Sequence, residues 1–271
     1  MAESLSTVVL EKSSAKKVAT IRLNRPEKRN AINQQMVDDM LAALENVRAD
    51  AEMRVVVVKG TGPSFCSGLD LYYLRSVTKN PPGDWDRHTS TRLLFDAVRN
   101  FPKVTIAQVH GYCLGGGLAL MNSHDLVIAA ANAQIGMPEI LRGSFGQMAT
   151  STLFHSGVSV KKAALVQLTG RNLTGVEADR LGLVSMAVEE SQLEGVTQDL
   201  AAEIATRHPA ALASAKIAVQ MGAHLGLPEA MRVDQLVGAW QHLMVDPVAH
   251  VEDYLMSQKG GPKGGYRRPD S

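Results

Sequence analysis

The sequence predicts an α/β fold, in which strands and helices alternate along most of the chain. Short runs of β-branched and aliphatic residues are separated by segments in which apolar residues recur every three or four positions. From about Gln192 onward only the helical pattern remains. The chain has 271 residues, 45% hydrophobic and 20% charged, which suffices for a sizeable core without disulfides or metals.

The first strands and the first helix follow from this pattern in order. Residues 8–10 and 18–23 are β-branched runs on either side of a polar segment, and they predict a hairpin. Apolar residues then recur at helical spacing from Met36 to Val47. The valine run at 54–59 is short and continuous, which favours a buried strand over a helix.

The middle of the chain continues the alternation. Residues 79–86 are polar and contain two prolines and a glycine, so we expect a mobile loop there. Residues 104–109 predict a second buried strand, and the glycine-rich stretch at 110–117 leads from it into an apolar helix. Residues 125–130 predict a further strand.

The C-terminal part is predicted to be helical. Four helices are expected, at residues 192–206, 209–224, 227–243 and 246–258. Residues 259–271 are rich in glycine and basic side chains, and we expect a flexible tail unless a partner subunit or ligand orders it. The predicted organisation is therefore a core at 1–191, a helical region for oligomer contact at 192–258, and this tail.

Charge and cysteine content exclude several classes of protein. The net charge is +1 and no long basic stretch precedes the tail, so a nucleic-acid partner has no electrostatic support. No apolar run approaches the roughly 18 residues that span a bilayer, and the N-terminus does not resemble a signal peptide. Cys66 and Cys113 have no partners at metal-ligand spacing, so we expect no metal site and a reducing, cytoplasmic location.

The glycines at 115–117 are the first candidate for a functional site. They follow a predicted buried strand and open a helix, where backbone can approach a ligand closely and unpaired amides point outward. Such a place favours developing negative charge. A tight structural turn with nothing bound is the alternative, although three consecutive glycines favour function. The spacing does not fit a dinucleotide fingerprint, and there is no Walker lysine.

A nucleophile elbow is a further interpretation of the same turn. Residues 111–115 (GYCLG) fit the G-x-[S/C]-x-G pattern and resemble the cysteine elbow of dienelactone-hydrolase-like α/β-hydrolases, with Cys113 as nucleophile. That mechanism needs an acid and then a histidine, for which Asp125 and His155 occur in the right order. We favour packing of Cys113 as a small apolar residue, because His155 lies near a predicted helix end and not at a strand end.

Four segments, in order over nearly the whole chain, resemble the crotonase (enoyl-CoA hydratase/isomerase) superfamily. They are RPEKRNA at residues 25–31, FCSGLDL at 65–71, HGYCLGGG at 110–117 and IGMPEILRG at 135–143. Each is weak alone, but together they are specific. The resemblance implies a spiral of repeated ββα units followed by a C-terminal helical region. It also implies an acyl-CoA substrate, a homotrimer or dimer of trimers, and no cofactor beyond the coenzyme A that the substrate carries.

The resemblance also implies which residues form the site. The backbone amides of Leu69 and Gly116 would form an oxyanion hole, which stabilises a thioester enolate more than the ground-state carbonyl. Leu69 is bulkier than the alanine that is frequent in the family. The expected substrate- and CoA-binding residues are Lys28, Arg29, Ala31, Ser67, Gly68, Leu69, Asp70, Leu71, Gly115 and Gly116.

Glu139 is the implied general base and acid. Its neighbours Met137, Ile140 and Leu141 are apolar, and desolvation among them would raise its pKa toward a useful value. Family hydratases with two catalytic glutamates place the other at the position of Ala119, which can neither accept nor donate a proton.

A single glutamate favours proton shuttling of the enoyl-CoA isomerase type. Several alternatives stay open: hydration, with a water held by Ser144 or Gln147; another one-glutamate reaction such as C–C cleavage, decarboxylation or hydrolysis; and a homologue that binds acyl-CoA without turnover.

Overall fold

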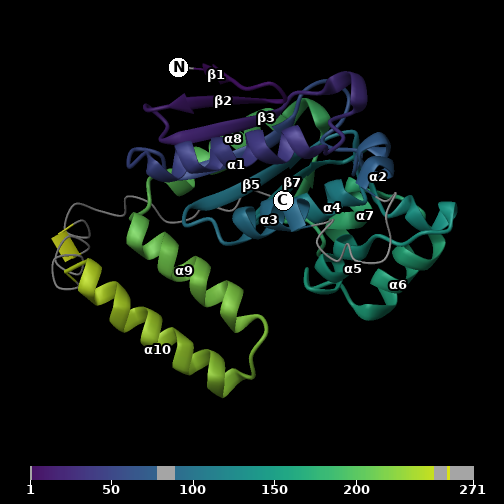
Figure 1. Cartoon of the computed structure of the whole chain (residues 1–271). Helices are drawn as coiled ribbons and strands as arrows, with labels where there is room; N and C mark the ends of the chain where they lie inside the picture. Colours follow the sequence, from purple (N-terminus) through teal and green to yellow (C-terminus); the bar gives the residue numbers. More distant parts are fainter. Residues whose placement is uncertain (1, 78–88, 247–254, 257–271) are drawn as a thin grey trace. The chain divides into compact units, whose positions relative to one another are not determined.

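The computed structural model describes residues 2–77, 89–246 and 255–256 (Figure 1). The chain forms two compact units, Met1–Arg207 and His208–Ser271. The predicted loop at 79–86, the tail at 259–271 and most of the predicted helix at 246–258 lie outside the described residues. None of the described helices combines the length and the apolar character that crossing a bilayer requires.

A mixed sheet forms the centre of the first unit. Within the described residues it has seven strands in the order β1-β2-β3-β4-β5-β7-β10. The strands are β1 (Ala2–Ser4), β2 (Val8–Ser13), β3 (Val18–Leu23), β4 (Val55–Gly60), β5 (Val104–Val109), β7 (Leu126–Ala130) and β10 (Met186–Val188). β1, β2 and β3 pair antiparallel, and β3 begins a parallel set that runs to β10. The predicted hairpin and the three later strands are confirmed.

The parallel strands are buried because both faces of the sheet are covered. All six residues of β5 and the first four of β4 are buried, which explains why these strands appear in the sequence as continuous aliphatic runs. In Figure 1, α1 (Gln34–Ala49) lies in front of the sheet and α8 (Glu190–Ala205) lies behind it. The Asn33 side chain caps α1 by accepting a hydrogen bond from the Met36 amide at 2.9 Å.

A second, smaller sheet runs beside the first. It contains β6 (Tyr112–Leu114), β8 (Gln134–Gly136) and β9 (Leu173–Thr174). Single bridges extend its ladder from Cys113 to Cys66 and from Leu69 to Ile32. Each of β4, β5 and β7 is therefore followed by a short segment of this second ladder and then by a helix. One strand of the main sheet, one segment of the second ladder and one helix make up a repeat, which is the predicted ββα spiral.

The remaining helices connect or cover these strands. In chain order they are η1 (Pro26–Lys28), α2 (Leu71–Val77), α3 (Thr89–Arg99), α4 (Gly116–Met121), η3 (Pro138–Arg142), α5 (Gln147–Phe154), α6 (Val160–Thr169), α7 (Gly175–Arg180), α9 (Pro209–Gly222) and α10 (Leu227–Met244). α9 and α10 pack against each other in the second unit.

The boundary between the units differs from the predicted one. We expected the core to end at residue 191, whereas the first compact unit ends at Arg207. The reason is that α8 packs on the sheet: Leu193, Thr197 and Ala201 are buried on its inner face. Glu194 on the same helix also pairs with Lys59 of β4, with 2.8 Å between carboxylate oxygen and ammonium nitrogen. Helical periodicity alone does not say which surface a helix covers.

Candidate active site

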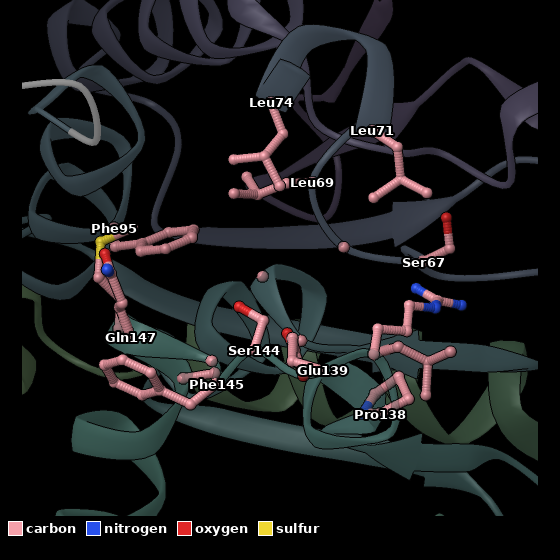
Figure 2. Close-up of a pocket in the computed structure, with 18 residues that line it drawn as sticks. Ser67, Leu69, Leu71, Leu74, Phe95, Pro138, Glu139, Ser144, Phe145 and Gln147 are labelled. Carbon is pink, nitrogen blue, oxygen red and sulfur yellow. The ribbon is translucent and has the colours of Figure 1, made fainter. Parts of the chain in front are cut away.

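A cavity of about 300 Å³ lies where the loop after β4, the turn before α4 and the η3–α5 segment meet (Figure 2). Its walls are mostly apolar, with few polar side chains, which is typical of small-molecule sites. The lining residues are Ser67, Gly68, Leu69, Leu71, Leu74, Phe95, Leu114, Gly115, Gly116, Pro138, Glu139, Arg142, Ser144, Phe145, Gly146, Gln147, Met148 and Ala149.

An ion pair holds the loop that contains Leu69. The Arg25 guanidinium lies 3.0 Å from the Asp70 carboxylate, and both side chains are mostly buried. Asp70 also accepts hydrogen bonds from the amides of Tyr72 at 2.9 Å and Tyr73 at 3.3 Å, which caps α2. Burial alone would raise the pKa of Asp70, but the bonds from Arg25 and from these two amides lower it below its usual 3.8.

The register of this loop directs the Leu69 amide toward the cavity. The Ile32 amide donates to the Gly68 carbonyl at 2.8 Å, and the Asp70 amide donates to the Ile32 carbonyl at 2.9 Å. In extended backbone, successive amides point to opposite sides, so the Leu69 N–H faces away from Ile32. Gly68 makes this approach possible with a φ of 102°, a conformation that favours glycine.

The Gly116 amide lies beside that of Leu69. A Cβ atom built on Gly116 would lie 3.4 Å from the Leu69 nitrogen, so the Gly116 backbone passes close to the Leu69 amide. Within the described residues, neither amide donates a hydrogen bond to another protein atom. Two such donors on one cavity wall can bind a single oxygen that gains negative charge during a reaction.

Glu139 contributes a carboxylate to the same cavity. It lies in η3, and Figure 2 shows it beside Ser144. Burial raises the pKa of the Glu139 carboxyl above its usual 4.5, while its own backbone amide and the nearby Arg142 act in the opposite direction. One carboxylate oxygen, Oε2, is buried without a hydrogen-bond partner. A raised pKa and a free oxygen are what a general base in a cavity requires.

Gly115 lets Glu139 lie close to the turn that contains the Gly116 amide. A Cβ atom on Gly115 would overlap Oε1 of Glu139, and the residue has a φ of 51°. The Gly115 amide donates to the Gly136 carbonyl at 2.9 Å, which fixes the turn before α4. The glycine run predicted as a functional turn therefore allows the Glu139 carboxylate and the Gly116 amide to share one wall.

Comparison with known proteins identifies relatives of this chain. Residues 13–242 match the sequence pattern of the family described as enoyl-CoA hydratase/isomerase. The chain belongs to this family. It is 34% identical to a putative enoyl-CoA hydratase of Thermus thermophilus over 82% of this chain and 88% of the relative. It is 33% identical to a hydroxycinnamoyl-CoA hydratase-lyase of Pseudomonas fluorescens over 73% of each chain.

Solved structures support the same membership in the enoyl-CoA hydratase/isomerase family. One of them is described as enoyl-CoA hydrates subunit I of Geobacillus kaustophilus HTA426. It superposes on this chain with a TM-score of 0.86 at 27% identity, covering 98% of this chain and 99% of the other. The crotonase-type fold expected from the four sequence segments is thereby confirmed.

The expected binding residues fall into two groups. Seven predicted residues line the cavity together: Ser67, Gly68, Leu69, Leu71, Gly115, Gly116 and Glu139. Four others do not line it. Lys28 and Arg29 are exposed beside the rings of Tyr72 and Tyr112, Ala31 is buried, and the Asp70 carboxylate is engaged by Arg25 and the start of α2.

Ala119 is buried and does not line the cavity. Its amide donates to the Gly115 carbonyl at 3.0 Å within the first turn of α4. Among the described lining residues, Glu139 is the only one with a carboxylate.

The structure contradicts the alternative in which Cys113 is a nucleophile. Cys113 lies in β6 and is fully buried, and its thiol contacts the Met121 sulfur at 3.7 Å. Burial raises the pKa of this thiol well above its usual 9.0, so it stays protonated and unreactive. A nucleophile elbow instead presents its side chain at a sharp turn open to substrate.

Sequence reasoning missed residues that support or extend the site. Asn30 is buried with a φ of 55° and donates to the carbonyls of Thr61 and Ser64, which ties the segment before α1 to the loop after β4. Asparagine tolerates left-handed backbone, and an asparagine in a turn was the available signal. Leu74, Phe95 and Phe145 line the cavity without any motif that would have indicated it.

Proposed function

We propose that this enzyme moves a double bond in an enoyl-CoA thioester from the 3- to the 2-position, with Glu139 as the only proton-transfer group. The observation that carries the proposal is one carboxylate with a raised pKa beside two convergent backbone amides. No second carboxylate accompanies it among the described residues that line the cavity.

The proposed reaction begins with the thioester oxygen bound by the Leu69 and Gly116 amides. Glu139 removes a proton from the carbon next to the thioester, and the electron pair passes to the oxygen as an enolate. Glu139 then returns its proton to the γ-carbon, while the enolate electrons restore the carbonyl and shift the double bond. Substrate and product have the same composition, and the glutamate ends ionised as it began.

The surroundings of Glu139 suit both halves of this shuttle. A carboxylate that is partly desolvated is a stronger base than an ordinary glutamate, and its protonated form is correspondingly stabilised until the second transfer. An apolar cavity also limits exchange of the transferred proton with solvent. Removing one amide donor from an oxyanion hole typically lowers the rate by about 10²–10³-fold.

Hydration of the double bond is the second candidate. The named relatives include hydratases, and the hydroxyl of Ser144 and the amide of Gln147 line the cavity near Glu139. These groups could hold a water molecule for addition to the 2-enoyl thioester. With one carboxylate, Glu139 would have to serve both proton transfers of the addition.

The test is turnover of 3-enoyl-CoA and 2-enoyl-CoA by the wild-type protein and by Glu139→Gln. We expect isomerisation of the 3-enoyl substrate to fall by about 10²–10⁴-fold in the variant, the usual contribution of a positioned general base. Glu52→Gln, an exposed glutamate in a turn, is the matched control and should retain full activity.

The outcomes separate the candidates. Isomerisation that survives in Glu139→Gln would eliminate the one-glutamate shuttle. Consumption of the 2-enoyl thioester with uptake of water would favour hydration. Tight binding of both thioesters without turnover of either would favour a homologue that only binds acyl-CoA.

A further inference from the structure

We propose that the cavity selects an acyl group ending in an aromatic ring with a hydrogen-bonding substituent. The ring would lie between Phe95 and Phe145, and its substituent would meet the Gln147 amide. This inference deepens the proposed function and rests on the thioester lying at the Leu69 and Gly116 amides.

The position of the reacting groups gives the cavity a direction. Figure 2 shows Ser67 and Leu71 on one side of Glu139. Two hydrogen bonds hold Ser67 against the exposed basic residues Lys28 and Arg29. The Ser67 amide donates to the Arg29 carbonyl at 2.9 Å, and its hydroxyl donates to the Lys28 carbonyl at 3.3 Å. The phosphate-bearing end of a CoA thioester carries negative charge, so it belongs on this side.

The acyl group then extends to the opposite side of Glu139. Figure 2 shows Phe95, Phe145 and Gln147 there. The cavity has a volume of about 300 Å³, at the small end of the usual range for ligand sites.

The two phenylalanines give this end its aromatic character. Phe95, on α3, is only 5% exposed, so it forms a fixed wall, whereas Phe145, in the segment before α5, is 55% exposed. An apolar ring left this open at a cavity is a surface that a ligand can cover. Aromatic rings gain about 0.5–1.5 kcal/mol from stacked or edge-to-face contacts beyond simple burial, which favours a planar group over a flexible chain.

Gln147 adds a polar group at this apolar end. It is the first residue of α5 and is exposed, so its side-chain amide is open to solvent and to a ligand in the cavity. The amide offers both a donor and an acceptor, so a phenolic hydroxyl could satisfy either. An acyl tail that is entirely alkyl offers this amide no hydrogen-bond partner, whereas a phenolic hydroxyl does.

The experiment measures binding, so it does not depend on turnover. Dissociation constants are determined by calorimetry for three unreactive thioesters: 4-(4-hydroxyphenyl)butanoyl-CoA, 4-phenylbutanoyl-CoA and hexanoyl-CoA. We expect the hydroxyphenyl compound to bind about tenfold more tightly than the phenyl compound, as for one well-made hydrogen bond. The phenyl compound should in turn bind more tightly than hexanoyl-CoA.

Two variants assign these preferences to residues. Gln147→Met keeps the side-chain length and removes the amide, so the tenfold hydroxyl preference should disappear. Phe145→Leu should reduce the preference for phenyl over hexanoyl by about three- to tenfold. Gln192→Met, at an exposed position on α8, is the matched control and should change neither ratio.

The results distinguish this inference from the proposed function. Equal binding of the hydroxyphenyl and phenyl compounds, or a hydroxyl preference that persists in Gln147→Met, would overturn the role of Gln147. Hexanoyl-CoA binding as tightly as the aryl compounds would overturn the aromatic pocket. The predicted affinities without isomerisation of any 3-enoyl-CoA would reject the proposed reaction and leave the acyl specificity established.

Discussion

At the scale of single residues, Glu139 combines a cost to folding with its proposed role as general base. Its Oε2 atom is buried without a partner, and burial raises the pKa of the carboxyl. Folding therefore favours the protonated form, so this group lowers stability as the pH rises from 4.5 through the folded pKa. Glu139→Gln should for this reason unfold at the same or a higher temperature than the wild type at neutral pH, while losing activity.

The raised pKa of Glu139 predicts the acid limb of the pH–rate profile. Proton abstraction needs the ionised carboxylate, so kcat/KM should fall as the pH drops through the pKa of Glu139 in the free enzyme. This midpoint should lie above 4.5, the usual value for glutamate, because burial raises the pKa. The measurement is kcat/KM for a 3-enoyl-CoA across the acid range, with folding checked by circular dichroism. A midpoint at or below 4.5 would contradict the assignment.

Gly115 provides a test of how closely Glu139 must lie to the amides of Leu69 and Gly116 for the proposed reaction. In Gly115→Ala the new methyl group would overlap Oε1 of Glu139 and displace the carboxylate. We expect a loss of at least about 10²-fold in kcat, since misplacement by about 1 Å can have this effect.

Gly182→Ala is the control for Gly115→Ala. Gly182 has a φ of 72°, so its substitution also strains the backbone, but nothing lies within 4 Å of the added atom. Both variants should lose some stability, and only Gly115→Ala should lose kcat. Equal kinetic losses in the two variants would show that backbone strain alone is responsible.

At the scale of elements, the Arg25–Asp70 pair connects η1 to the start of α2 and so fixes the loop that presents the Leu69 amide. Asp70→Ala removes a helix cap and leaves Arg25 without its carboxylate partner. We expect a loss of about 3 kcal/mol in the free energy of unfolding, as for breaking a buried ion pair. Urea unfolding of Asp70→Ala, Arg25→Met and the double variant measures it.

The double variant should cost less than the sum of the two single changes, because each single change leaves the other group unpaired. Asp96→Ala is the matched control. It breaks an exposed pair with Arg92, with 3.4 Å between the charged atoms, and should change stability by less than about 1 kcal/mol. Strict additivity at Arg25 and Asp70 would mean that the two residues act independently.

The strands and helices that could be predicted from the sequence are those with a clear hydrophobic pattern of their own. The run at 104–109 corresponds to β5 residue for residue, because a strand buried on both faces is continuously apolar. β6, β8 and β9 were not predicted as strands. Each has two or three residues, too few to show a period, and their pairing depends on the chain returning to the same place three times.

The sequence predicts the site residues whose type is restricted by backbone conformation. It does not predict those that line the cavity only because of how the helices pack. The glycines at 115–117 and Glu139 after Pro138 are visible as motifs, because conformation restricts the residue types there. Leu74 and Phe95 occur on helices among other apolar residues, so the sequence does not distinguish a side chain that lines a cavity from one that fills the core. Only the arrangement of α2 and α3 makes this distinction.

At the scale of the whole chain, the site is assembled from successive turns of the spiral. Leu69 follows β4, Gly116 follows β5 and Glu139 follows β7, and the short second ladder aligns these three segments. Each repeat places its loop at the same end of the parallel strands. The proposed reaction therefore depends on the register between repeats, and a change within the second ladder should affect catalysis before it affects the main sheet.

The last prediction concerns self-association, which the family resemblance implies. In the second unit, α10 has no buried residue, and Leu236 and Leu243 are 71% and 85% exposed. Side chains of this size on one helix are typical of a surface covered in an oligomer. We expect a trimer or a dimer of trimers by sedimentation velocity, and Leu243→Glu should shift it toward smaller species.

Gln235→Glu adds the same charge at an exposed polar position on α10 and should leave the oligomer intact. A monomeric wild-type protein, or equal dissociation in both variants, would contradict a role for this apolar surface.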